Sequence, residues 1–152
     1  MAIRTCAALA ALLLAAACTK PGHDDPPGAY APGSIQEFQA TVGDRVFFDL
    51  DSSQLRADGR ENLDKQAAWL KRYGTYAVTI EGHADERGTR EYNIALGARR
   101  AQAVRDYLAS RGIQPSRMRT VSYGKERPVA VCNDISCWSQ NRRAVTVLGA
   151  TS

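Results

Sequence analysis

The chain has 152 residues, of which 44% are hydrophobic and 24% are charged, and its formal net charge is +4. This length and apolar content suffice for one globular domain with additional targeting or linker segments, but not for two large cores. The basic residues form only short blocks, such as Arg99-Arg100 and Arg142-Arg143, with acidic residues between them. Because nucleic-acid-binding proteins more often carry a clustered basic face, nucleic acid is disfavoured as a partner.

Residues 1–17 have the pattern of a bacterial signal peptide. Arg4 supplies a positive charge, and an apolar run rich in Ala and Leu extends from Cys6 to Cys18. The run is shorter than the roughly 20 apolar residues that span a bilayer, and small residues end it. Its end, Leu14-Ala15-Ala16-Ala17-Cys18, resembles a lipobox, in which a peptidase cuts before a lipidated cysteine. We therefore expect Cys18 to carry a lipid anchor, with a plain secretory signal cut at A-x-A as the alternative.

Residues 18–37 are predicted to form a linker, because Pro and Gly recur in them without any apolar periodicity. Thr19 follows the expected lipidated cysteine. In the bacterial lipoproteins that this segment resembles, Asp at that place favours retention in the inner membrane. The resemblance therefore implies a cell outer membrane location, with the protein facing the periplasm. The folded domain is expected over residues 38–150.

The first half of this domain predicts a strand, a helix and a second strand. Residues 45–51 (RVFFDLD) alternate as a strand does. Asp58 with Glu61 predicts a capping box at the start of a helix that ends near Tyr73. Residues 76–81 alternate again.

A long helix is predicted between Thr89, as its N-cap, and Gly112, which ends it. Its apolar face is a stripe spaced at i, i+4, i+7 and i+11, formed by Gly97, Ala101, Val104 and Leu108. Two further strands are expected at residues 119–123 and 144–148. Strands that alternate with helices predict an α/β fold of the α+β sandwich type, with about four strands and two main helices packed on one face of the sheet.

The second predicted helix also carries a polar stripe. Asn93, Leu96 and Arg100 lie at i, i+3 and i+7, so they share one face beside the apolar stripe. Asp85 lies in the loop that enters this helix. A carboxylate can bind an ammonium group, and a guanidinium can grip a carboxylate with two parallel hydrogen bonds. The pair Asp85 and Arg100 therefore predicts a site for a zwitterion.

These residues resemble the OmpA-like peptidoglycan-binding family, whose motif reads N-x-x-L-S-x-x-R-A after an Asp in the preceding loop. Asn93, Leu96, Arg100 and Ala101 are in register with it, while Gly97 stands in place of Ser. The blocks GHADERGT, SYGKE and NRRAV extend the resemblance over roughly residues 45–148, most closely to the lipoproteins of that family known as peptidoglycan-associated lipoproteins.

The resemblance implies that the domain binds peptidoglycan through the diaminopimelate of the stem peptide, without cleaving it. It assigns the pocket to a group of polar and apolar side chains, namely Asp85, Arg100, Asp51, Leu96, Tyr92, Asn93 and Arg143. It also implies TolB and the other Tol-Pal proteins as partners. Another envelope or secretion machine that uses the same kind of domain, and a structural lipoprotein that binds only other proteins, are the alternatives.

Other chemistries find less support in the residues. Asp85 and Arg100 could form a purely structural ion pair. His83 with Asp85 and Glu86 lacks the three or four converging ligands of a zinc site, and no nucleophile motif is present. The segment from Asp49 opens like a calcium loop, but Gln54 stands where the turn needs Gly. We therefore expect no enzyme activity, no metal and no cofactor.

Cys132 and Cys137 remain after Cys6 and Cys18 are assigned to the signal peptide and the anchor. Their C-x₄-C spacing does not fit a C-x-x-C redox motif. Because an exported domain lies in an oxidising compartment, a disulfide between them is predicted. Residues 128–138 are expected to form turns, with Trp138 packed back on the core.

Overall fold

The computed structural model describes residues 30–150. The predicted signal peptide, Cys18 and most of the predicted linker lie outside these residues, so their assignment stays a prediction. No helix among the described residues is long and apolar enough to cross a membrane.

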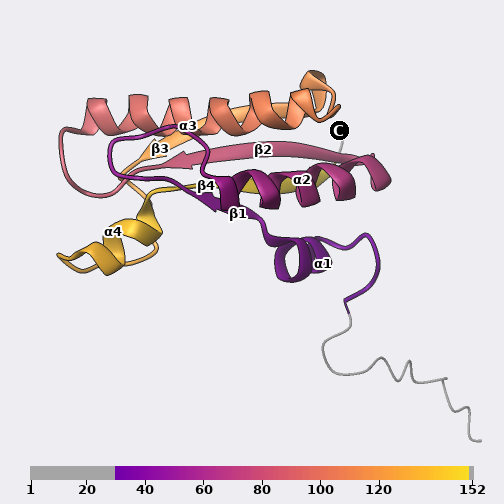
Figure 1. Cartoon of the computed structure of the whole chain (residues 1–152), viewed down its shortest axis with the longest axis horizontal. Coiled ribbons are helices and arrows are strands. Elements are labelled where there is room, and N and C mark those ends of the chain that lie inside the picture. Colours follow the sequence, from indigo (N-terminus) through magenta and orange to yellow (C-terminus); the bar gives the residue numbers. More distant parts are fainter. Residues whose placement is uncertain (1–29, 151–152) are drawn as a thin grey trace, which may run out of the picture.

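The described chain forms one four-stranded sheet with two long helices packed on it (Figure 1). The strands are β1 (Arg45–Phe47), β2 (Tyr76–His83), β3 (Met118–Gly124) and β4 (Arg143–Ala150). The long helices are α2 (Ala57–Arg72) and α3 (Arg90–Ser110), and a short helix, α4 (Ile135–Asn141), lies between β3 and β4. The predicted α/β fold class is confirmed.

The strand order is β1-β4-β2-β3. β4 pairs antiparallel with both β1 and β2, whereas β2 and β3 are parallel and are connected through α3. A parallel pair needs such a crossover, because its strands run in the same direction. The crossover brings the end of β2 and the beginning of α3 together, and the loop between them contains Asp85.

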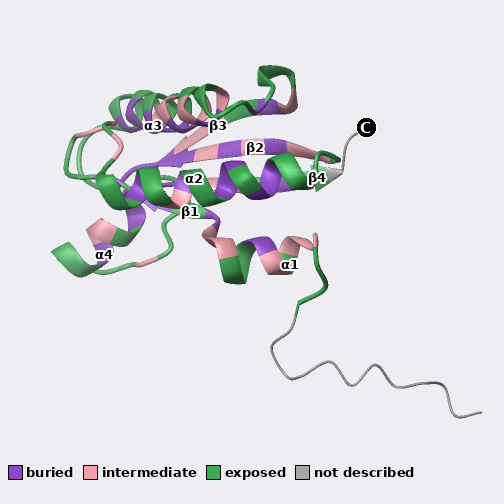
Figure 2. Ribbon diagram, turned by 45° about the vertical axis from the view of Figure 1, so that its right-hand side comes forward, coloured by how far each residue is buried: buried purple, intermediate pink, exposed green. Residues whose placement is uncertain are grey.

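The core lies between the sheet and the two helices, as the buried inner faces in Figure 2 show. Val78 and Ile80 of β2 are almost inaccessible to solvent, as are Ala101, Val104 and Leu108 of the stripe predicted for α3. Thr89 caps α3 as predicted, with its hydroxyl accepting a hydrogen bond from the backbone N–H of Tyr92 (3.2 Å).

Glycines bring α3 unusually close to the sheet. A Cβ at Gly82 would lie 1.8 Å from the carbonyl oxygen of Gly97, and a Cβ at Gly97 would lie 2.4 Å from Ser122 Oγ. The structure therefore explains why Gly97 stands where the family motif has Ser: a side chain there would separate the helix from β2.

Three local predictions differ from the structure. The capping box at Asp58 does not form, because α2 begins at Ala57 and the Asp58 carboxylate pairs with Arg56 instead (3.1 Å). A short helical segment begins within the range assigned to the linker. It consists of α1 (Ile35–Glu37) and the π-helical η1 (Phe38–Gly43), and Phe38 packs on Trp69. β1 ends at Phe47, earlier than expected.

The loop between β3 and β4 contains regular structure that the sequence reasoning missed. Asp134 caps α4 by accepting a hydrogen bond from the backbone N–H of Ser136 (2.7 Å). Cys132 and Cys137 form the predicted disulfide, with a Cα–Cα distance of 5.7 Å. Trp138 does not reach the core; its ring contacts Arg87 in the loop after β2. The turn-forming residue Asp134 therefore begins a short helix instead of forming only a turn.

Candidate functional site

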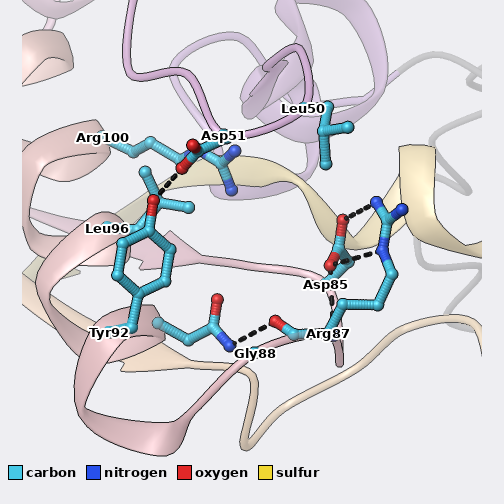
Figure 3. A pocket seen from close by; sticks show the side chains of 9 residues that line it. Leu50, Asp51, Asp85, Arg87, Gly88, Tyr92, Leu96 and Arg100 are labelled. Atoms are coloured by element: carbon cyan, nitrogen blue, oxygen red, sulfur yellow. Dashed lines mark hydrogen bonds and ion pairs between the residues drawn. The ribbon is translucent and has the colours of Figure 1, made fainter.

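A pocket of about 260 Å³ opens beside the N-terminal half of α3. It lies between that helix, the segment after β1 and the loop after β2 (Figure 3). Its lining combines two carboxylates, two guanidinium groups and apolar or aromatic side chains, from Leu50, Asp51, Asp85, Arg87, Gly88, Tyr92, Asn93, Leu96 and Arg100. Among the described residues, no group of three or more His, Cys, Asp or Glu side chains could hold a metal ion.

Arg100 supplies a buried positive charge at the inner end of the pocket. Its side chain is fully inaccessible, and it donates hydrogen bonds to the carbonyl oxygens of Ser52 (2.8 Å), His83 (2.8 Å) and Asp49 (3.1 Å). Burial lowers its pKa to about 10, which still leaves it charged at neutral pH. A guanidinium has five N–H donors, so these bonds leave two for a ligand.

These three carbonyls also explain how the sequence builds the pocket. Ser52 and Asp49 belong to the segment after β1, and His83 ends β2. Arg100 therefore ties the segment after β1 and the end of β2 to α3. The same contacts hold the guanidinium in place. Because the carbonyl groups carry no net charge, the positive charge of Arg100 can still attract an anionic group.

Asp85 lies in the loop after β2 and is buried. Its carboxylate accepts hydrogen bonds from Arg87 (2.7 Å from Nη2) and from Arg142 (3.3 Å from Nη1). Burial raises the pKa of Asp85, but these hydrogen bonds outweigh that effect and hold the pKa below its usual value. No hydrogen bond or ion pair between Asp85 and Arg100 occurs within residues 30–150, so the alternative of a structural ion pair between them is wrong.

Asp51 and Tyr92 close the outer side of the pocket. Asp51 has a left-handed backbone conformation (φ 52°), which turns the chain sharply after β1. The hydroxyl of Tyr92 donates a hydrogen bond to the Asp51 carboxylate, and Figure 3 shows this contact in front of Arg100. Both residues are exposed, so this side of the pocket faces solvent.

Asn93 and Leu96 have different parts in the site. The side-chain amide of Asn93 donates hydrogen bonds to the carbonyl oxygens of Arg87 (2.8 Å) and Thr89 (3.0 Å). These bonds fix the loop to the helix, and they use both amide N–H groups. Leu96 is buried and forms an apolar wall.

The structure brings six of the seven predicted pocket residues together; Arg143 is not among the residues that line the pocket. Its guanidinium donates a hydrogen bond to the carbonyl oxygen of Arg127 (3.2 Å). Its neighbour Arg142 contacts Asp85 instead. Arg142 is the C-cap residue of α4 and Arg143 begins β4, so these neighbouring side chains have different partners. Arg87 was also missed, although it lies only two residues after Asp85.

Comparison with known proteins agrees with this geometry. The OmpA family model matches residues 47–143. The peptidoglycan-associated lipoprotein of Rhizobium meliloti strain 1021 is 71% identical over 122 residues, which are 80% of this chain and 69% of that protein. The peptidoglycan-associated lipoprotein of Pseudomonas putida is 44% identical, and the alignment covers 90% of this chain and 92% of that protein.

Solved structures show the same fold. The peptidoglycan-associated lipoprotein from Burkholderia pseudomallei is 41% identical, with a TM-score of 0.70 over 73% of this chain and 96% of that chain. The C-terminal domain of Helicobacter pylori MotB, at 20% identity and a TM-score of 0.66, covers 72% of this chain and 86% of that chain and shares the fold alone. The chain therefore belongs to the OmpA family, and the relatives that it resembles over most of its length are peptidoglycan-associated lipoproteins.

Proposed function

We propose that this protein is an outer-membrane lipoprotein that binds peptidoglycan non-covalently through the diaminopimelate of uncross-linked stem peptides. The observation that carries the proposal is the pocket in which Asp51, Asp85 and Arg100 surround one cavity. The free end of diaminopimelate is an amino-acid centre with one ammonium and one carboxylate group. A pocket with fixed charges of both signs suits such a zwitterion better than it suits a simple cation or anion.

The environment of the charges supports this assignment. The guanidinium of Arg100 is buried, and no carboxylate of residues 30–150 forms a hydrogen bond or ion pair with it, which favours a ligand that brings one. The lowered pKa of Asp85 keeps a negative charge available for an ammonium group. Leu96 and Tyr92 offer apolar surface to the methylene groups between the two ends of diaminopimelate.

The cellular role follows from the anchor and the pocket together. With a lipid on Cys18 in the outer membrane, a periplasmic domain that holds the wall would link the two layers. In this role the protein would act with TolB and the other Tol-Pal proteins in envelope integrity and in constriction of the outer membrane during cell division. Replacement of Cys18 by Ser should abolish incorporation of labelled palmitate and release the protein from the membrane.

Sedimentation of the purified protein with isolated sacculi tests wall binding. Asp85→Ala and Arg100→Ala should each weaken binding by about ten- to a hundredfold, since each removes a charge-assisted contact of roughly 1.5–3 kcal/mol. Free meso-diaminopimelate should compete with the sacculi. Asp64→Ala is a matched control. It breaks the ion pair between Asp64 and Arg111 at the other end of α3, whose length (2.7 Å) equals that of the pair between Asp85 and Arg87.

Wild-type binding by both folded pocket variants would contradict the assignment of the site. Absence of any binding to sacculi would favour a lipoprotein that binds only other proteins. Co-purification with TolB from cells would separate the Tol-Pal role from a role in another envelope or secretion machine.

A further inference from the structure

The carboxylate of Asp85 is already fully engaged in the free protein. Oδ1 accepts hydrogen bonds from the backbone N–H and from Nε of Arg87, both at 3.2 Å, and Oδ2 accepts from Nη2 of Arg87 at 2.7 Å and from Nη1 of Arg142 at 3.3 Å. A carboxylate offers about four lone-pair positions, so none remains for a ligand. An ammonium group can reach Asp85 only if one of these donors leaves.

Arg87 is the donor that can leave. Its side chain is 39% exposed, whereas that of Arg142 is 10% exposed. Arg142 is also held by a hydrogen bond from its Nε to the carbonyl oxygen of Phe48 (3.1 Å). Among the described residues, the Arg87 guanidinium has hydrogen bonds only to Asp85, as Figure 3 shows at the edge of the pocket.

Trp138 provides a surface for this guanidinium. The Arg87 Cζ lies 3.9 Å from the centroid of the Trp138 ring, within the range of a cation–π contact. The indole N–H of Trp138 donates a hydrogen bond to the Glu86 carboxylate, so the ring is attached to the same loop. The Cys132–Cys137 disulfide ends directly before Trp138 and holds the start of α4. A guanidinium released from Asp85 would therefore stay at the mouth of the pocket.

We infer that Arg87 selects zwitterionic ligands by exchanging ion-pair partners, with Trp138 as its positioning residue. The ligand's ammonium replaces Arg87 on Asp85, and the ligand's carboxylate then pairs with the released Arg87. This inference rests on the proposed function and deepens it, since it names the residue that distinguishes a free amino-acid centre from other amines.

The selectivity follows from counting charge pairs. The ammonium group of a zwitterion displaces Arg87 from the Asp85 carboxylate, and the carboxylate of the same zwitterion then pairs with Arg87. Every charged group at the mouth of the pocket therefore keeps an oppositely charged partner. An amine without a carboxylate would leave the Arg87 guanidinium beside Arg142 without a carboxylate in hydrogen-bond contact. A ligand that has a carboxylate but no ammonium group cannot displace Arg87 from Asp85, because its negative charge is repelled by the Asp85 carboxylate.

The test compares two soluble ligands on three proteins. The ligands are the stem tripeptide that ends in meso-diaminopimelate and the same tripeptide with its free-end carboxyl group converted to an amide, which keeps the ammonium. The proteins are the wild type, Arg87→Ala and the control Arg90→Ala. Arg90 is 65% exposed at the start of α3 and pairs with Glu126 (3.2 Å), so the control changes the same charge nearby without touching Asp85.

Calorimetric titration should show that amidation weakens binding to the wild type by about a hundredfold or more, because the amide loses charge-assisted contacts with both Arg87 and Arg100, each worth about tenfold. The penalty should fall to about tenfold in Arg87→Ala, which retains only Arg100 for the carboxylate, and stay at the wild-type value in Arg90→Ala. An equal penalty in the wild type and Arg87→Ala would overturn the inference while leaving the proposed function intact. Failure of the wild type to bind either peptide, or sacculi, would overturn both.

A second set of variants tests Trp138. Trp138→Ala should reduce the amidation penalty a few-fold, whereas Trp138→Phe should keep it, because Phe retains a ring face for the guanidinium. Ile135→Ala on the same short helix is the control, as its side chain is 71% exposed. A merely structural role of Trp138 would lower the affinity for both peptides equally; that result would overturn its assignment as a positioning residue.

Discussion

The two walls of the pocket are built differently. The helix wall, formed by Asn93, Leu96 and Arg100 of α3, is buried and bonded to the backbone of three other segments. The loop wall, Asp85–Gly88, is held mainly by side chains that reach it from elsewhere: Lys125 donates to the Gly88 carbonyl (2.6 Å), and Trp138 contacts Arg87. The helix wall therefore holds the Arg100 guanidinium in a fixed position, while the loop wall has side-chain contacts that a ligand can replace.

The largest effect is expected where the helix wall meets the sheet. Gly82→Ala would place a Cβ 1.8 Å from the Gly97 carbonyl oxygen, and the helix backbone cannot yield without losing its packing on β2. We expect a loss of at least about 3 kcal/mol in the free energy of unfolding, or no folded protein. Urea denaturation measures it. Gly149→Ala on β4 is the matched control, since a Cβ added there would meet no atom within 4 Å. Equal stability of both variants would refute the close approach.

A smaller, pH-dependent effect is expected from His83, at the junction of the two walls. Its ring is 2% exposed, and within residues 30–150 neither ring nitrogen has a hydrogen-bond partner. Burial, and then the nearby charges of Arg143 and Arg127, lower the pKa of His83 from 6.5 to about 4. Glu81 lies 3.8 Å from Nε2 but does not offset these effects.

The lowered pKa of His83 determines how the stability of the fold changes with pH. Between about pH 6.5 and pH 4 the unfolded chain binds a proton at His83 that the folded protein excludes. Stability is therefore complete above pH 6.5 and falls by roughly 3 kcal/mol as the pH drops to about 4. Urea denaturation across this range should show the slope, and His83→Gln should flatten it. The same slope in that variant would assign the effect to other groups.

The helix wall could be predicted from sequence, and much of the loop wall could not. The Thr89 cap and the spacing of Leu96 and Arg100 are local, so helical periodicity places them. The partners of Asp85 depend on tertiary structure: Arg142 is 57 residues away, and only the register of β4 decides whether it or Arg143 faces the loop. α4 was missed because its 7 residues are too few for a periodic pattern.

The smallest effect is expected from opening the Cys132–Cys137 disulfide, which tests how far the loop wall depends on α4. Closing a ring with a sequence separation of 5 stabilises by about 2 kcal/mol in the chain-entropy model. Replacing both cysteines by Ser should thus lower the melting temperature by on the order of 10 °C. Because Trp138 follows Cys137 directly, its contact with Arg87 should weaken, while the bonds of Arg100 stay intact. The affinity for sacculi at room temperature should therefore change by no more than a few-fold. Thermal unfolding measures the melting temperature, and sedimentation measures the binding.

Two free thiols in the untreated, denatured protein would show that the bridge is absent. Complete loss of wall binding in a folded Cys-to-Ser variant would show instead that the helix wall cannot hold the ligand without α4.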